Sequence, residues 1–127
     1  MMKLSKRIEE LLEKHDFSVC GKINERYKAF NQYDIDLETY SPEGENVIVS
    51  LIYDGTEEDF INEFRNYAEY FDAEEHAEMW IAGRGTNGVP NSIRTLLEDA
   101  DWIKSTLQKV AYDLENIYNI EGKLKEQ

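Results

Sequence analysis

Cysteine and histidine are scarce in this chain of 127 residues, which contains Cys20, His15 and His76 and no others of either type. One cysteine excludes an internal disulfide and a cysteine zinc site. The His-Glu-x-x-His spacing of a zinc hydrolase is absent, and neither histidine has a sequence context that suggests a catalytic base for Cys20. We therefore expect no cofactor, no bound metal and no enzymatic activity.

Long apolar runs are also missing. The basic start, residues 1–7, is not followed by an apolar segment of signal-peptide length, and no stretch approaches the roughly 20 apolar residues of a membrane span. Together with the single cysteine, this pattern predicts a cytoplasmic protein.

The sequence also lacks the context of a dinucleotide-binding site, although it contains a glycine motif with the right spacing. Gly83, Gly85 and Gly88 match the letters of the dinucleotide fingerprint, which must follow a strand and open a helix. Here the glycines follow a helical pattern, and Val89 and Pro90 separate them from the next helix. We expect a loop over 83–90 and no nucleotide site.

Basic side chains are nearly absent from residues 34–78. That segment contains fifteen acidic side chains and one base, Arg65, so it has a net charge of −14. The remaining residues have twelve acids and thirteen bases, which leaves −13 for the whole chain. A concentrated negative field repels nucleic acid and anionic lipid and attracts a basic protein surface. Solubility alone also accounts for such acidity.

Apolar residues are still plentiful, at 41% of the chain with 12% aromatic. That content is enough for a buried core, and the length suits a single domain over residues 1–127. We find no internal repeat, low-complexity tract or linker.

Periodicity predicts three strands, because apolar and polar residues alternate over 17–23 and 33–40 and because 46–53 is rich in Val, Ile and Leu. Residues 41–45 contain Pro42 and Gly44 and predict a tight turn, so the last two strands should pair antiparallel. We expect 24–32 to be irregular and the 46–53 strand to be central or well covered.

Helical spacing marks the remaining segments. Residues 2–15 form one amphipathic helix. Thr56 and Asp72 are expected to cap two more, the second with Met79, Trp80 and perhaps His76 facing inward. A long helix over about 92–120 has apolar residues spaced alternately by four and three: Leu96, Ala100, Ile103, Leu107, Val110, Leu114 and Ile117. This seam either packs within its own domain or pairs with a second copy to form a homodimer. The predicted fold is α+β, a three-stranded antiparallel sheet against N-terminal and long C-terminal helices, in the order α-β-β-β-α-α-α.

The predicted partner-binding residues are acids on these elements. Asp34, Asp36 and Glu38 should form a row on the polar face of a strand, with neighbours roughly 6.6–6.8 Å apart. Such a row is sparser than the phosphates of one DNA strand, about 3.4 Å apart along the axis, but nearby helix acids can supplement it. The remaining predicted residues are Glu57, Glu58, Asp59, Asp72, Glu74, Glu75 and Glu78.

Residues 53–60, 75–80 and 88–90 resemble small acidic proteins of unassigned function carried by bacterial phages and conjugative elements. The order of elements and the charge also resemble acidic anti-CRISPR proteins that occupy the DNA-binding channel of Cas9. That resemblance implies a non-enzymatic DNA mimic that inhibits a host defence nuclease, in which these acids replace phosphates. The alternative is a mobile-element accessory protein that dimerises or assembles through its C-terminal helix.

Overall fold

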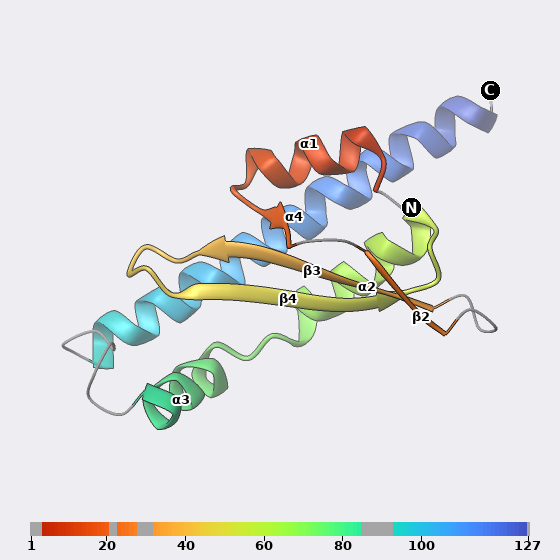
Figure 1. Ribbon diagram of the computed structural model, residues 1–127. Helices are drawn as coiled ribbons and strands as arrows, with labels where there is room; N and C mark the ends of the chain where they lie inside the picture. The colour runs from red at the N-terminus through yellow and green to blue at the C-terminus, as the bar shows by residue number, and fades with distance from the viewer. Residues whose placement is uncertain (1–3, 21–22, 28–31, 85–92, 127) are drawn as a thin grey trace.

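The computed structural model describes residues 4–20, 23–27, 32–84 and 93–126. These residues form an α+β fold in which the predicted order of elements is confirmed, with one additional strand (Figure 1). The elements are α1 (Lys6–Lys14), β1 (Ser18–Val19), β2 (Asn24–Tyr27), β3 (Gln32–Tyr40), β4 (Asn46–Tyr53), α2 (Glu57–Tyr70), α3 (Ala73–Arg84) and α4 (Ile93–Glu126).

The sheet is antiparallel and is organised around β3. β4 pairs with the length of β3 from Tyr33 to Tyr40, while β1 and β2 share the opposite edge of β3. The prediction that residues 24–32 are irregular was wrong for β2, which pairs Asn24 with Asp34 and Glu25 with Tyr33. Its sequence is polar on both faces, so pairing with β3, and not apolar alternation, defines this strand.

The predicted turn between β3 and β4 is confirmed. The backbone N–H of Ser41 donates to the Glu45 carbonyl at 2.9 Å, and the N–H of Glu45 donates to the Ser41 hydroxyl at 3.0 Å. Gly44 has a φ of +85°, a conformation that glycine adopts without steric penalty. The turn sets the register in which Tyr40 lies opposite Asn46.

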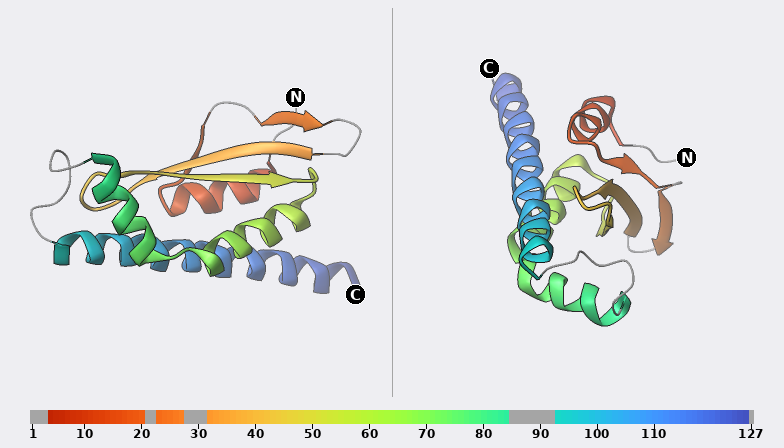
Figure 2. Two further views of the ribbon diagram at one scale, coloured as in Figure 1. Left: turned by 90° about the horizontal axis from the view of Figure 1, so that it is seen from below. Right: turned by 90° about the vertical axis from the view of Figure 1, so that its left-hand side faces the viewer.

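The core lies between the sheet and three helices that share one side of it, α1, α2 and α4 (Figure 2). β3 contributes Ile35 and Leu37 to this core, and Phe17 packs edge-on against Phe64 with ring centroids 6.3 Å apart. The inward positions of β4 alternate with exposed positions, and those of β3 alternate with half-buried or exposed ones, so the sheet packs on the core through one face. Among the described elements, no helix crosses its outer face (Figure 2).

The apolar seam of α4 packs inside its own domain. Its residues from Leu96 to Leu114 are at most 2% exposed, and those from Ile103 onward join the main core. α4 also extends to Glu126, beyond the predicted end near residue 120.

The prediction that Met79 faces inward was wrong, because this side chain is 66% exposed. α3 instead packs through Ala73 and Ala77 against Leu96 and Ala100 of α4. These small side chains allow the two helices to approach closely, and this contact sets the rotation of α3. The loop predicted over 83–90 was wrong for Gly83 and Arg84, which end α3. Residues 85–90 of that prediction and the side chain of Trp80 lie outside the described parts of the structure.

Candidate functional site

Asp34, Asp36 and Glu38 lie on the outer face of β3, as predicted, and we call them the acidic row. Their alternate neighbours Ile35 and Leu37 are at most 1% exposed, so the strand directs the three carboxylates away from the core. In an extended strand, successive side chains on one face are roughly 6.6–6.8 Å apart. The row is therefore a linear array of negative charge on the uncovered side of the sheet.

Exposed apolar side chains accompany the acidic row. On β4, Ile52 lies opposite Asp34 and Ile48 opposite Glu38, and they are 43% and 46% exposed. Tyr40, which follows the row on β3, is 58% exposed. Charged, aliphatic and aromatic groups thus share one surface, which is a composition that suits protein recognition.

The isoleucines of β4 were missed at the level of sequence, where this strand was expected to be central or well covered. Among the described strands β4 pairs with β3 alone and is therefore an edge strand, and its residues alternate between exposed and buried along its whole length. The pairing register of β3 and β4 identifies the two exposed isoleucines. Once the turn places Val47, Val49 and Leu51 on the core side, Ile48 and Ile52 must lie outside.

The carboxylates of Asp36 and Glu38 have few partners among the described residues. Glu38 accepts a hydrogen bond from the side-chain amide of Asn46 at 3.2 Å, and within the described residues neither Asp36 nor Glu38 has an ion-pair partner. Cys20 lies beside the row, with its N–H donating to the Asp36 carbonyl at 2.8 Å. Burial, the Glu38 carboxylate and the Asp36 carboxylate raise the pKa of the Cys20 thiol, in that order of importance. The carboxylates of Glu38 and Asp36 therefore disfavour a negative charge on the Cys20 thiol.

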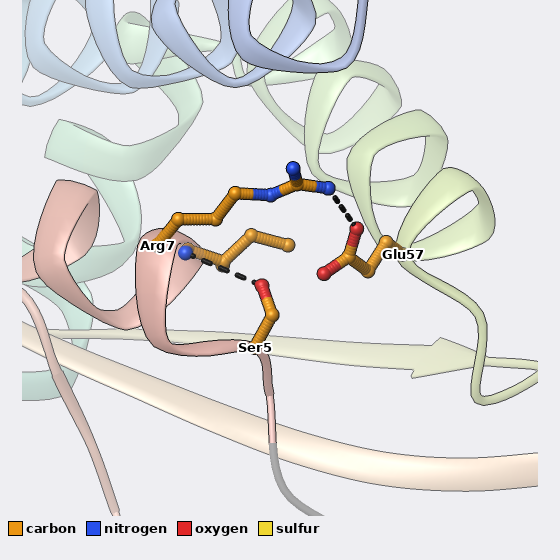
Figure 3. A network of polar contacts seen from close by, with 4 residues as sticks. Ser5, Arg7 and Glu57 are labelled. Atoms are coloured by element: carbon orange, nitrogen blue, oxygen red, sulfur yellow. Dashed lines mark hydrogen bonds and ion pairs between the residues drawn. The ribbon is translucent and has the colours of Figure 1, made fainter. Parts of the chain in front are cut away.

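Two of the three acids at the start of α2, Glu57 and Asp59, have structural roles, and Glu58 is exposed. Glu57 forms an ion pair with Arg7 of α1 (Figure 3). Asp59 accepts a hydrogen bond from the Asp54 N–H at 2.8 Å, and its own N–H donates to the Thr56 hydroxyl at 3.1 Å, which caps the helix. Hydrogen bonds from the Thr56 hydroxyl and N–H hold the pKa of Asp54 below its usual value. These contacts stabilise the helix start and join it to α1.

The acids of α3 form a third group. Asp72 caps the helix by accepting a hydrogen bond from the Glu75 N–H at 3.0 Å, which confirms the predicted cap. Glu74, Glu75 and Glu78 are exposed.

The ten predicted partner-binding residues therefore lie in three places. The acidic row occupies the outer face of the sheet, and the start of α2 lies at the end of the sheet where Tyr33 faces Tyr53. α3 packs against α4 near the other end, where the Glu43 N–H of the β3–β4 turn donates to Asp99. The row is the group of acids that lies on a strand, where no helix start accounts for its charges.

Each of the two histidines contacts the side chain of another residue. His15 Nε2 lies 2.8 Å from an Asp113 carboxylate oxygen, which links α1 to α4, and the His76 ring lies 5.3 Å from that of Phe71. In the described residues, no three His, Cys, Asp or Glu side chains are grouped so that they could hold a metal ion. No helix within the same residues has the length and apolar character needed to cross a membrane.

No protein-family model, curated protein or solved structure matches this chain.

Proposed function

We propose that this protein is a non-enzymatic inhibitor that binds a basic surface of a nucleic-acid-handling protein through the outer face of its sheet. The observation that carries the proposal is the acidic row, which presents its carboxylates on a face that no described helix covers. Regularly spaced carboxylates complement Arg and Lys side chains arranged to contact phosphates. A host defence nuclease of the restriction or CRISPR type is the partner class that this chemistry favours.

The apolar side chains beside the row favour binding of a protein, because small counterions would not bury them. Tyr40, Ile48 and Ile52 would be removed from water in a complex, which adds a contribution that salt does not screen. The acidic row would then provide orientation and rapid association, while the apolar groups slow dissociation.

Assembly through the C-terminal helix has less support from the geometry. Leu107, Val110 and Leu114 are all 0% exposed within the domain, so a dimer formed through them would have to withdraw these side chains from the core. The inhibitor is therefore the function that we propose.

A pull-down from bacterial lysate at low and high salt tests the proposal, with captured nucleases then purified and assayed for DNA cleavage in the presence of the chain. The test variant reverses the row (D34K/D36K/E38K). The control makes the same change in charge at three exposed positions on helices (E13K/E69K/D101K). We expect the wild type and the control to bind and inhibit at low salt, and the row variant to lose more than about tenfold in affinity. Capture and inhibition that survive reversal of the row would exclude this function.

A further inference from the structure

A cavity of about 360 Å³ lies where α2 ends and α3 begins, away from the acidic row. Three aromatic residues of the α2 end, Tyr67, Tyr70 and Phe71, form part of its lining. Asp72 and Glu75 line it from the beginning of α3, and His76 and Met79 complete it. We call this cavity the α2–α3 pocket.

Three of the rings that line the pocket, those of Tyr67, Phe71 and His76, are neighbours, and we call them the aromatic wall. The Tyr67 and Phe71 rings have centroids 6.5 Å apart and are inclined by 33°, and the His76 ring lies 5.3 Å beyond Phe71. Ring faces carry negative electrostatic potential and attract cations, and a planar guanidinium group also stacks on them.

The charged groups that line the pocket have one sign. Both are carboxylates, and no lysine or arginine lines it within the described chain. Asp72 uses one oxygen to cap α3, and no described residue bonds to its second oxygen, which can therefore accept a hydrogen bond from a ligand. A guanidinium group can donate to a carboxylate while its plane lies against a ring.

The end of α2 already binds a cation of the chain itself. A helix C-terminus carries a partial negative charge, and the last turn of α2 contains no basic residue. The ammonium group of Lys104 donates to the Phe71 carbonyl, so a cation from α4 already lies at this helix end.

Two apolar side chains at the pocket are unusually exposed. Tyr70 of α2 is 79% exposed and Met79 of α3 is 66% exposed, although Ala77, which is also on α3, is almost fully buried. A ligand in the pocket would cover them. An anion would be repelled by the two carboxylates, and a purely apolar ligand would leave those carboxylates without a partner.

We propose that the α2–α3 pocket binds a guanidinium group, either of a free small molecule or of an arginine side chain on another protein. The aromatic wall provides stacking, and Asp72 and Glu75 provide charge-assisted hydrogen bonds. The inference does not rest on the proposed inhibitor function, because no residue of the acidic row lines this pocket.

Titration of the ¹⁵N-labelled full chain, followed by NMR, tests the inference with three probes. These are L-arginine amide, a short neutral peptide with one central arginine, and the same peptide with citrulline, which has nearly the same shape as arginine but no charge. We expect saturable shifts centred on residues 67–79, with dissociation constants on the order of millimolar for arginine amide. Tighter binding of the arginine peptide than of arginine amide would indicate a protein side chain as the source, and equal binding a small molecule.

Two variants locate the binding. Asp72→Asn removes the charge but keeps a residue that caps helices well, and Tyr70→Ala removes an exposed ring without disturbing the core. Each should weaken arginine binding by about three- to tenfold. Glu69→Gln, an exposed acid of α2 that does not line the pocket, should leave it unchanged. The inference is wrong if citrulline binds as well as arginine, if the shifts spread over the whole acidic surface without saturating, or if D72N and Y70A bind normally.

Discussion

The acidic row and the first turn of α2 each contain three acids, but their surroundings differ. At the start of α2, Glu57 pairs with Arg7 and Asp59 accepts a hydrogen bond from the backbone of Asp54. In the row, Asp36 and Glu38 have no ion-pair partner in the described chain. The comparison teaches that negative charge alone does not identify a binding surface. Acids that serve the fold must first be separated from acids that do not.

The largest expected difference between the two regions concerns partner binding. Neutralising the row (D34N/D36N/E38Q) should reduce affinity for a captured nuclease by about tenfold or more, whereas E57Q/E58Q should change it less than about threefold. Equilibrium titration of the purified partner measures both. Equal losses in the two variants would show that total charge, and not the row, determines binding.

The free energy of unfolding should depend more on the start of α2 than on the outer face of the sheet. Thr56→Ala removes the cap that accepts the Asp59 N–H and should lower the free energy of unfolding by about 1 kcal/mol. Ser50→Ala, on the outer face opposite Asp36, should change it by less than about 0.5 kcal/mol. Urea denaturation followed by circular dichroism distinguishes them, and a larger effect at Ser50 would contradict the assignment of structural roles.

Lowering the pH should remove part of the stability that the start of α2 gives to the folded protein. Hydrogen bonds from Thr56 hold the pKa of Asp54 below its usual value, so the ionised form stabilises the folded state. This contribution is present above the unfolded pKa, near 4, and is lost as the pH falls through the lowered folded pKa. We expect wild type to exceed Asp54→Asn in stability at neutral pH and the two to converge in strong acid. A difference that persists below pH 2 would refute this origin.

The smallest expected effect is local to the row. The Glu38 and Asp36 carboxylates contribute to the raised pKa of Cys20, so Glu38→Gln should lower it, increase the thiolate fraction and speed alkylation by iodoacetamide a few-fold. Glu58→Gln on α2 is the matched control and should not change the rate. Unchanged alkylation in E38Q would indicate that burial alone, the largest cause of the shift, suppresses the thiol.

Local patterns predicted much of this structure. The alternation of β3 placed the acidic row on the outer face, and the Ser41–Glu45 turn set the hairpin register. The caps at Thr56 and Asp72 follow from side chains that bond within three residues, so they are visible in sequence. The α4 seam left two interpretations open, and the structure shows it packed in its own core.

Features that depend on distant segments were not predictable in this way. β2 exists because β3 offers it hydrogen bonds, and β4 is an edge strand because no described strand pairs with its other side. The rotation of α3 depends on Ala73 and Ala77 meeting α4, which is why Met79 was misplaced. The α2–α3 pocket requires two helices to meet at an angle, and the ion pair of Arg7 with Glu57 joins residues fifty positions apart.

The edge position of β4 has a consequence for self-association. Its sequence, Asn46–Tyr53, contains no charged residue, and an uncharged strand with a free edge is a template on which further strands can add into fibrils. The acidic row lies on the adjacent strand, about 4.8 Å away, so two copies that approach through β4 bring their carboxylates together. The same charges that we propose to bind a basic partner would therefore oppose polymerisation of the protein with itself, and strong salt would weaken that effect.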